Sequence, residues 1–561
     1  MNKFETIVAE AKERQRQRRQ ATRVSVATGE CGLAVGAGEV FEAIRFELRR
    51  RGIAGDVVEV GCDGMCHAAV LVDVERPGLP RVTYGGVTPD KVPWLVEQCL
   101  VHGQSARELA VGVWAPDPLD GIPPISSLPF WQGQRRILTQ NLGLVDPFDV
   151  DDYIARGGYA ALARALSEMT PEQVIDEVRL SGLTGRGGAY FPTGLKWAGC
   201  RRAAGLPRYL VVNAEEGEPG VFKDRHIMEA DPHRLIEGTA IAAYAIGAEK
   251  GFIYINGEAA AAIRRVENAL RQGRERNLLG QRILGTAFSF EPEIRIGAGG
   301  YVLGEASTMH ASIEGERPSP RVKLVRSVES GVFDKPTVTN NVETIACVPA
   351  IVANGGAWHA GIGSAASKGT KLIALSGNVA RPGLLEVPMG TTLRAIIEDM
   401  GGGVPEGRGL QAVLTGGPSG GLLPASLLDL PFEEGALERE GSILGAGGMI
   451  AIDDSNCVVD VVRLLTAYNQ QESCAKCTPC REGTPRMLEA LDRIAAGQAD
   501  QQDVDDLLYL CELLGPTSLC GLGQTAPNPI TSAWRHFRED FDAHIVEKRC
   551  PRGICPVSTR R

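Results

Sequence analysis

The chain has 561 residues, which is too long for one compact core and predicts three or four domains. Hydrophobic residues make up 43% and charged residues 23%, as in ordinary globular proteins. The formal net charge is −10 and the basic residues are scattered, so binding of nucleic acid by bulk electrostatics is not expected. No apolar run is long enough to cross a membrane, so direct membrane insertion is not expected either.

The predicted elements change character along the chain. Residues 1–23 form an Arg-rich helix without the apolar stretch of a secretory signal, which predicts a cytoplasmic protein, alone or within a membrane-associated complex. Residues 33–100 read as a small α/β unit, and 101–147, rich in Pro, Gly and Asp, as a linker lying on the next domain. Helices and strands alternate over 153–349, which predicts a parallel sheet. Short strands surround a helix in 370–428, and helices follow from 457 onward.

Within these regions the pattern predicts particular helices and strands. The predicted helices cover 39–51, 90–100, 391–400, 458–469, 486–496 and 504–514, and the predicted strands cover 56–60, 69–73, 209–212 and 251–255.

Fourteen cysteines are distributed unevenly, with one tight group late in the chain. Without an export signal, reduced thiols that hold metal fit this pattern better than a disulfide framework. Cys474, Cys477 and Cys480 are spaced at i, i+3 and i+6, and Cys520 follows forty residues later. Three close thiolates and one remote thiolate are typical of a [4Fe–4S] cluster, whereas structural zinc more often uses two separated CxxC pairs.

A glycine-rich loop at 182–197 leads into a predicted helix. Gly185 and Gly187 let backbone N–H groups approach a phosphate, and Arg186 and Lys196 add positive charge. Tyr190 occupies the last glycine position of the GxGxxG pattern, so the standard dinucleotide fingerprint is excluded. A tight turn is the alternative interpretation of such a loop.

Two further segments favour a ligand site. Carboxylates and an amide follow the strand 209–212, where they could accept hydrogen bonds from a heterocycle or a ribose. A second glycine-rich segment covers 297–305, and paired asparagines follow at 339–344. A solvated acidic loop and ordinary helix capping are the alternatives for these polar groups.

Four motifs occur together in one order: GRGGAYFPTGLKW, NAEEGEPGVFKDR, PTVTNNVET and SCAKCTPCREG. From about residue 150 to 555 the chain therefore resembles the NADH-oxidising flavoprotein subunit of respiratory complex I, and the related diaphorase subunits of NAD-linked hydrogenases and formate dehydrogenases. The resemblance implies an α/β multidomain fold: a thioredoxin-like N-terminal domain, a Rossmann-like FMN domain, a β-grasp domain and a C-terminal helical iron–sulfur bundle. The expected boundaries are 1–105, a linker at 106–150, then 151–355, 356–440 and 441–561.

The resemblance also implies residue roles. Cofactor-binding residues would be Gly185, Arg186, Gly187, Lys196, Asn213, Glu215, Glu216, Gly304, Glu305, Asn340, Asn341 and Thr344, around FMN. NADH would meet Phe191, Glu218 and Lys323. The [4Fe–4S] ligands would be Cys474, Cys477, Cys480 and Cys520. No side chain is expected to act as an acid or base, because hydride transfer takes place at FMN.

The N-terminal unit resembles the thioredoxin-like [2Fe–2S] domain fused to some of these diaphorases. Cys62 and Cys66 match its later CxxxC pair and Cys31 one early ligand, but Val26 stands near the other early position. Three thiols are too few for the usual site, although His67 adjoins Cys66, so a structural domain without a cluster is predicted. The terminal Cys550–Cys555 segment resembles the lead into an extra ferredoxin domain of longer relatives.

The nicotinamide site departs from the family pattern. Gly199 stands where an aromatic residue is usual, Ala306 replaces a second glutamate, and Arg326 replaces a phenylalanine. The FMN site is thus expected to be kept and the NADH site to be altered.

The sequence predicts an FMN and iron–sulfur electron-transfer subunit that passes electrons between NAD(P)H and an iron–sulfur chain, that is, an NADH:acceptor oxidoreductase subunit. Its expected partners are NAD(H) and other iron–sulfur and catalytic subunits of a complex. The alternative is a relay subunit that has lost nicotinamide binding and exchanges electrons only with partner subunits. A purely structural subunit is disfavoured, because the FMN and cluster motifs are complete.

Overall fold

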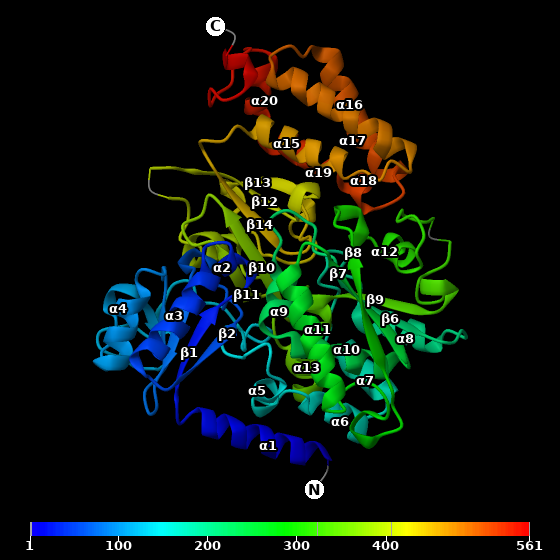
Figure 1. Ribbon diagram of the computed structural model, residues 1–561. Helices are drawn as coiled ribbons and strands as arrows, with labels where there is room; N and C mark the ends of the chain where they lie inside the picture. The colour runs from blue at the N-terminus through cyan, green and yellow to red at the C-terminus, as the bar shows by residue number, and fades with distance from the viewer. Residues whose placement is uncertain (1–2, 323, 406, 560–561) are drawn as a thin grey trace.

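The computed structural model describes residues 3–322, 324–405 and 407–559. It contains three β-sheets and a C-terminal group of helices, which confirms the expected α/β multidomain architecture (Figure 1). In the ribbon view the N-terminal sheet lies to one side, and the C-terminal helices cap the molecule at the opposite end from helix α1 (Lys3–Arg18). Among the described residues, no helix has the length and apolar character needed to cross a membrane.

The first sheet has five strands in the order β2-β1-β3-β4-β5. Strand β1 runs parallel to β2 and antiparallel to β3, and helix α3 packs against both β1 and β2. Helix α3 buries Val40, Ile44 and Leu48, which recur at i, i+4 and i+8 and so form one apolar face. The elements are β1 (Thr22–Ala27), α2 (Glu30–Leu33), α3 (Ala37–Arg51), β2 (Gly55–Val60), η1 (Cys66–Ala68), β3 (Val72–Glu75), β4 (Val82–Tyr84), α4 (Val92–Val96), η2 (Glu97–Val101) and β5 (Ala110–Val113).

The segment expected as a linker adds a strand to one sheet and makes hydrogen bonds with another. Strand β5 falls within it and pairs with β4, so the first sheet extends past residue 105. Further along, the buried Glu386 carboxylate accepts hydrogen bonds of 2.9–3.0 Å from the backbone N–H groups of Ile137 and Thr139. Glu386 belongs to strand β11 (Gly383–Pro388) of the third sheet, so this part of the segment lies against that sheet.

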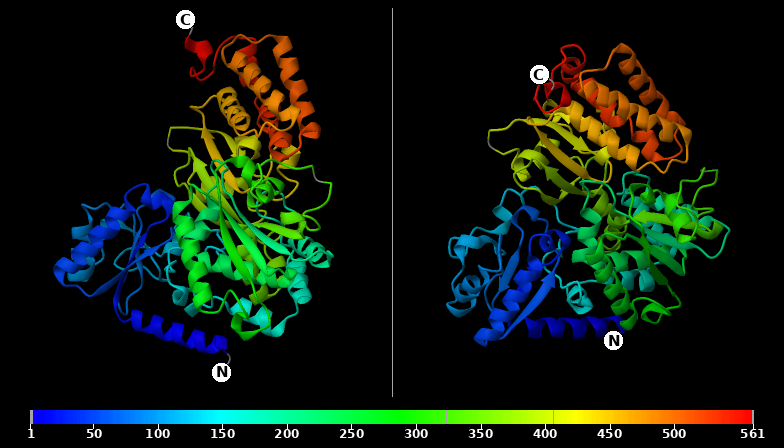
Figure 2. Two further views of the ribbon diagram at one scale, coloured as in Figure 1. Left: turned by 45° about the vertical axis from the view of Figure 1, so that its right-hand side comes forward. Right: turned by 45° about the horizontal axis from the view of Figure 1, so that its top comes forward.

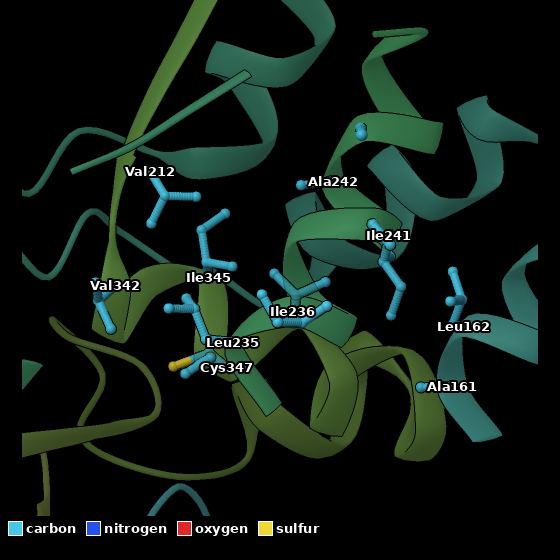
Figure 3. Packing of buried hydrophobic residues seen from close by; sticks show 14 of the residues in the cluster. Ala161, Leu162, Val212, Leu235, Ile236, Ile241, Ala242, Val342, Ile345 and Cys347 are labelled. Atoms are coloured by element: carbon cyan, nitrogen blue, oxygen red, sulfur yellow. The ribbon is translucent and has the colours of Figure 1, made fainter. Parts of the chain in front are cut away.

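The central domain has a parallel four-stranded sheet in the order β8-β7-β6-β9. The strands are β6 (Tyr209–Ala214), β7 (Lys250–Asn256), β8 (Glu291–Gly297) and β9 (Thr337–Asn341). Helices α10 (Pro232–Ile246) and α13 (Val342–Asn354) pack on each other, and Figure 3 shows Leu235, Ile236 and Ile345 of these helices filling the space next to Val212 of β6. Helices α7 (Pro171–Leu180), α8 (Thr193–Arg202), α9 (Lys223–Ala230), α11 (Ala260–Glu275) and α12 (Ala306–Ile313) complete this domain.

The third sheet lies between the central sheet and the C-terminal helices (Figure 2). Its order is β11-β10-β14-β12-β13, with β10 (Thr370–Gly377), β12 (Leu410–Thr415), β13 (Gly421–Pro424) and β14 (Gly448–Asp453). Strand β14 lies beyond residue 440 and pairs with both β10 and β12, so this sheet closes only after the expected boundary. The expected helix at 391–400 is π-helical over Ala395–Met400.

The chain ends in a helical bundle. Helices α15 (Val458–Gln471) and α16 (Thr478–Ala495) pack side by side, α17 (Gln501–Thr517) packs on α16, and α18 (Gly521–Thr525), α19 (Asn528–His536) and α20 (Arg538–Ile545) follow. Helix α16 begins eight residues before the position expected at 486, because Cys477 and Pro479 start it and a second proline, Pro485, is accommodated inside it.

Candidate functional site

The four cysteines of the predicted cluster site converge on one cavity. Cys474, Cys477, Cys480 and Cys520 all line it, together with Leu519 and Leu522 of the same bundle and with Val302 and Pro320 of the central domain. The pattern of three close cysteines and one remote cysteine therefore predicted a real spatial group. Four thiols around one enclosed space are the donor set that a [4Fe–4S] cluster requires, so the residues present fit that cofactor.

Helix starts position these thiols. Cys477 is the N-cap of α16 and Cys480 lies in its first turn. Cys520 directly precedes α18. Gly523 lets α18 approach α16, because a Cβ atom at this position would lie 3.1 Å from Cβ of Cys480 and 2.6 Å from Oγ of Ser518.

The glycine-rich segment after β8 reaches the cysteine cavity from the central domain. The ring of Tyr301 packs against Cys480, Cys520 and Leu522, and its backbone N–H donates a 2.8 Å hydrogen bond to the Glu472 carboxylate, two residues before Cys474. Gly300 has a φ of +131°, a conformation that side chains rarely adopt. The segment 297–304 thus forms one wall of the cluster site.

The same segment is tied to the end of strand β6. The Asn213 amide donates a 2.9 Å hydrogen bond to the carbonyl of Gly304, and its Oδ1 accepts one of 3.1 Å from the N–H of Glu215. Asn213, which precedes the acidic loop 215–218, therefore contacts this segment at Gly304, and Val302 of the same segment lines the cysteine cavity.

The carboxylates of the acidic loop fall into two groups. Glu216 caps helix α9, because its oxygens accept hydrogen bonds of 2.8 and 3.0 Å from the N–H groups of Asp224 and Arg225. By contrast, both carboxylate oxygens of Glu215 and one of Glu218 are buried without a hydrogen-bond partner in the described part of the chain. Burial raises the pKa of Glu215 to about 7 and that of Glu218 to about 8. These carboxyls are not the solvated loop that the sequence left as an alternative.

Unsatisfied buried polar atoms in a native fold call for an explanation, and a bound polar ligand supplies one. Glycines surround these carboxyls: a Cβ at Gly297 would lie 2.4 Å from Glu215, and one at Gly417 would lie 1.8 Å from Glu218. The glycines let the backbone come close to the two carboxyls, and the unpartnered oxygens fit a polar ligand such as a flavin.

Hydrogen bonds and close packing hold the glycine-rich loop at 185–188 in place. The N–H of Arg186 donates to Oγ1 of Thr344 at 2.8 Å, and its buried guanidinium donates to Thr184 and to the carbonyl of Lys368. Gly187 packs on Asn341, with the position of a Cβ only 3.0 Å from Cβ of that residue. Arg186 thus braces the loop against the third sheet.

Three more of the expected cofactor residues are engaged by the protein itself. The ammonium of Lys196 donates to the carbonyl of Thr339 at 2.8 Å, and the indole of Trp197 donates to Oδ1 of Asn340 at 2.9 Å. Asn341 caps α13 by accepting from the N–H of Glu343. Capping, which the sequence left open as the ordinary interpretation, therefore holds for Asn341, and Glu305 likewise caps α12.

A buried ion network lies beneath these loops. Lys223 contacts Asp224 at 2.7 Å and Glu343 at 3.0 Å, and Lys371 of β10 contacts Glu343 at 2.5 Å. Burial lowers the pKa of Lys371 to about 8, whereas the two ammonium groups hold the pKa of Glu343 below its usual value. The network joins the central domain to the third sheet, and removing one member would leave a buried charge unpaired.

Several residues at the expected nicotinamide site are exposed. Phe191 is 48% exposed, Glu218 is half-buried, and Lys323 lies outside the described residues. Leu324 is 88% exposed, and Arg326 is exposed as well. Gly199 has space beside it, since a Cβ there would make only an ordinary 3.5 Å contact with Val328.

Sequence reasoning named three thiols of one possible metal group but missed its histidine, and it missed a second group altogether. The thiols Cys31, Cys62 and Cys66 of the N-terminal unit meet His226 of α9, a residue of the central domain. In the C-terminal bundle, Cys457, His544, Cys550 and Cys555 form a second buried group whose ligand atoms all lie within 4.8 Å of one another, a set that suits a tetrahedral ion. Each histidine stands alone in the sequence, so no local spacing pattern could have indicated it.

Comparison with known proteins agrees with this geometry. Residues 178–350 match the family model described as the Nuo51 FMN-binding domain, 460–544 match the NADH-ubiquinone oxidoreductase-F iron-sulfur binding region, and 372–423 match the SLBB domain. The chain is 47% identical over 422 residues to the HndC subunit of the NADP-reducing hydrogenase of Solidesulfovibrio fructosivorans, covering 75% of this chain and 86% of the relative. It is also 47% identical over 415 residues to the F 2 subunit of the NADH-quinone oxidoreductase of Rhizobium meliloti (strain 1021), covering 74% and 99%. The solved NAD+-reducing [NiFe]-hydrogenase in the H2-reduced state has a similar fold, with a TM-score of 0.66, 29% identity and coverage of 93% of this chain and 84% of that one.

The chain therefore belongs to the family formed by the F subunits of NADH-quinone oxidoreductases and their hydrogenase-linked relatives. It is a flavin and iron–sulfur electron-transfer subunit with an FMN-binding domain and a [4Fe–4S]-binding region. The family, the two cofactors and the type of oxidoreductase predicted from the four motifs are thereby confirmed.

Proposed function

We propose that this chain passes electrons between NAD(P)H and the iron–sulfur centres of partner subunits, within a multisubunit oxidoreductase of the cytoplasm. The observation that carries the proposal is the position of the segment 297–304. On one side it is bound by Asn213 of the candidate flavin site, and on the other its residues Tyr301 and Val302 reach the cysteine cavity. A flavin and a cluster bound at these two sites would both contact this one segment.

FMN bound in this site would supply the step from hydride to single electrons, which neither a nicotinamide nor an iron–sulfur cluster can make alone. The residues of the chain would bind FMN and orient it. The N–H group of Gly187 and the ammonium of Lys196 are proposed to face the flavin phosphate. Gly185 shapes their loop, since its N–H donates to the carbonyl of Phe191 at 2.9 Å, and Arg186 braces it. Asn213 and the unpartnered carboxyl of Glu215 are proposed to face the ring system, and the carboxyl of Glu218 the nicotinamide amide.

The other residues expected to contact FMN hold the surrounding helices and loops in place. Glu216, Glu305 and Asn341 hold helix starts at the edge of the site, and Asn340 and Thr344 fix the loops that carry Lys196 and Arg186. We propose that these residues shape the flavin site through their hydrogen bonds.

The test is an anaerobic titration of the FMN- and cluster-loaded chain with NADH and, separately, with NADPH. Bleaching of the flavin band, followed by reduction of the [4Fe–4S] cluster in the paramagnetic resonance spectrum, is the expected result. In Cys520→Ser, flavin should still bleach while the cluster signal is absent. Failure of both nucleotides to bleach the flavin would overturn the nicotinamide step.

That failure would favour a relay subunit that exchanges electrons only with partner subunits. The composition and exposure of the segment 322–326 favour this second function. The segment contributes no aromatic side chain, and its described residues Val322, Leu324, Val325 and Arg326 are exposed.

A further inference from the structure

Three thiols of the N-terminal domain and one imidazole of the central domain converge at the boundary between the two. Cys31 lies in α2, Cys62 follows β2, Cys66 begins η1, and His226 lies in α9. Their ligand atoms, three Sγ and one imidazole nitrogen, all lie within 4.8 Å of one another. Cys62 and His226 are buried, and Cys31 and Cys66 are half-buried.

The imidazole of His226 is oriented by its own helix. Its Nδ1 atom lies 2.6 Å from the carbonyl oxygen of Phe222, one turn earlier, and Nε2 lies 3.6 Å from Sγ of Cys66. Because a carbonyl only accepts hydrogen bonds, Nδ1 carries the proton and the lone pair of Nε2 points toward the thiols. A backbone carbonyl that fixes the tautomer in this way is typical of histidines that bind metal.

The two domains are fitted closely around these ligands. Gly61, next to Cys62, packs on α9 so tightly that a Cβ would lie 2.1 Å from Cβ of Ala230. The N–H of Glu30 donates to the Glu229 carboxylate at 3.1 Å. The buried guanidinium of Arg265 donates to the carbonyls of both Thr28 and Glu229, at 2.8 and 2.6 Å. His226 is therefore held in register with Cys31 and Cys62 by contacts on both sides of it.

The chemistry of this set is that of a metal centre. Three thiolates and one imidazole form a donor set used by zinc and by iron. In a tetrahedral site with Zn–S bonds of about 2.3 Å and Zn–N bonds of about 2.0 Å, neighbouring ligand atoms are about 3.5–3.8 Å apart. The observed convergence is compatible with that spacing after small side-chain adjustments.

We propose that Cys31, Cys62, Cys66 and His226 ligate one metal centre that bridges the N-terminal and central domains. The N-terminal domain supplies three of the ligands and the central domain supplies the fourth, so the centre forms only when the two domains are docked. A single tetrahedral ion and a [2Fe–2S] cluster share this thiolate–imidazole chemistry, and the stoichiometry of iron and sulfide distinguishes them.

The experiment compares metal and acid-labile sulfide in the anaerobically purified full chain and in variants. His226→Ala and Cys31→Ser remove one ligand from each domain, and His226→Cys restores a fourth soft ligand. His67→Ala is the matched control, because His67 adjoins Cys66 in sequence but its Nδ1 contacts the carbonyl of Pro382, outside the thiol group. Retained FMN and retained iron of the Cys474 group report that a variant has folded.

Both ligand-removing variants should lose the same amount of metal relative to the parent. His67→Ala should keep that metal, and His226→Cys should bind it again. Loss of about one zinc or one iron without sulfide identifies a single ion, and loss of about two irons with two sulfides identifies a [2Fe–2S] cluster. Unchanged metal in either folded ligand-removing variant would overturn the proposal. So would a disulfide among the three cysteines of the anaerobic parent, a measurement that does not depend on how the variants fold.

Discussion

The backbone N–H of Tyr301 donates a 2.8 Å hydrogen bond to the carboxylate of Glu472, although the two residues are separated by 171 positions in the chain. Tyr301 belongs to the glycine-rich segment that ends at the candidate flavin site, and Glu472 precedes the first cysteine of the cluster group by two residues. The bond fixes the position of one redox site relative to the other. An edge-to-face contact between Tyr301 and Tyr468, with ring centroids 6.2 Å apart, supports the same junction.

The cluster cavity gives the first prediction. Replacing Cys520 with Ser should abolish the [4Fe–4S] signal and remove about four irons per chain, while FMN stays bound, because the flavin residues lie in another domain. Cys511→Ser is the control: Cys511 is equally buried in α17 but does not line the cavity. Iron analysis and the paramagnetic resonance spectrum of the reduced protein are the measurements. Full iron content in Cys520→Ser would exclude this residue as a ligand.

The sequence predicted the cluster and flavin sites because their residues are contiguous in motifs. Cys474, Cys477 and Cys480 lie within seven positions, and the parallel sheet follows from alternating helices and strands, so local spacing carries the information. His226 and His544 could not be found in this way, since each completes a group only after distant segments fold together. Strands β5 and β14 were missed because they fall in segments expected as a linker and as part of the helical bundle, and each joins a sheet whose other strands precede it in the chain.

The flavin phosphate gives the second prediction. Lys196 lies in the first turn of α8, where a helix start and an ammonium group together favour an anion. Lys196→Ala should lower the FMN content several-fold and leave the cluster spectrum intact. Arg202→Ala removes an exposed positive charge at the opposite end of the same helix and should bind FMN normally. Flavin released on acid precipitation, measured by fluorescence, decides the comparison, and equal flavin in the two variants would remove Lys196 from the site.

The buried carboxyl of Glu218 gives a prediction on pH dependence. Burial raises its pKa to about 8, from an ordinary value of 4.5, so folding takes up a proton between these two pH values. Stability therefore falls as the pH rises through this range, because the folded chain binds more protons than the unfolded one. Glu218→Gln cannot ionise and should lose this decline, so its melting temperature relative to the parent should increase from about pH 5.5 to about pH 8.5.

Thermal unfolding followed by circular dichroism measures this difference. The control is Glu293→Gln, an exposed glutamate of β8, whose melting temperature should follow that of the parent at every pH. A constant offset between Glu218→Gln and the parent across the range would show that Glu218 is already ionised in the folded chain.

The last prediction concerns the nicotinamide site, where Gly199 and Arg326 occupy positions that the family usually gives to aromatic residues. Stacking of a base on an aromatic side chain contributes about 1–3 kcal/mol in nucleic-acid complexes, so two missing contacts should weaken the binding of the adenine ring at least tenfold. A donor held loosely is also oriented poorly, and small misplacements of reacting groups cost on the order of a hundredfold in rate. We therefore expect the isolated chain to be reduced slowly by NADH, with half-saturation well above the micromolar range.

The double variant Gly199→Phe/Arg326→Phe tests this directly. Space for a side chain exists at Gly199, whose added Cβ would make an ordinary contact with Val328, and Arg326 is exposed, so the fold should tolerate both changes. Stopped-flow reduction of the flavin should show half-saturation at least tenfold lower in the double variant than in the parent. Gly199→Ala/Arg326→Ala, which adds no aromatic ring, should behave like the parent. Fast reduction of the parent at micromolar NADH would contradict the prediction, because the remaining residues would then hold the nucleotide without these two rings.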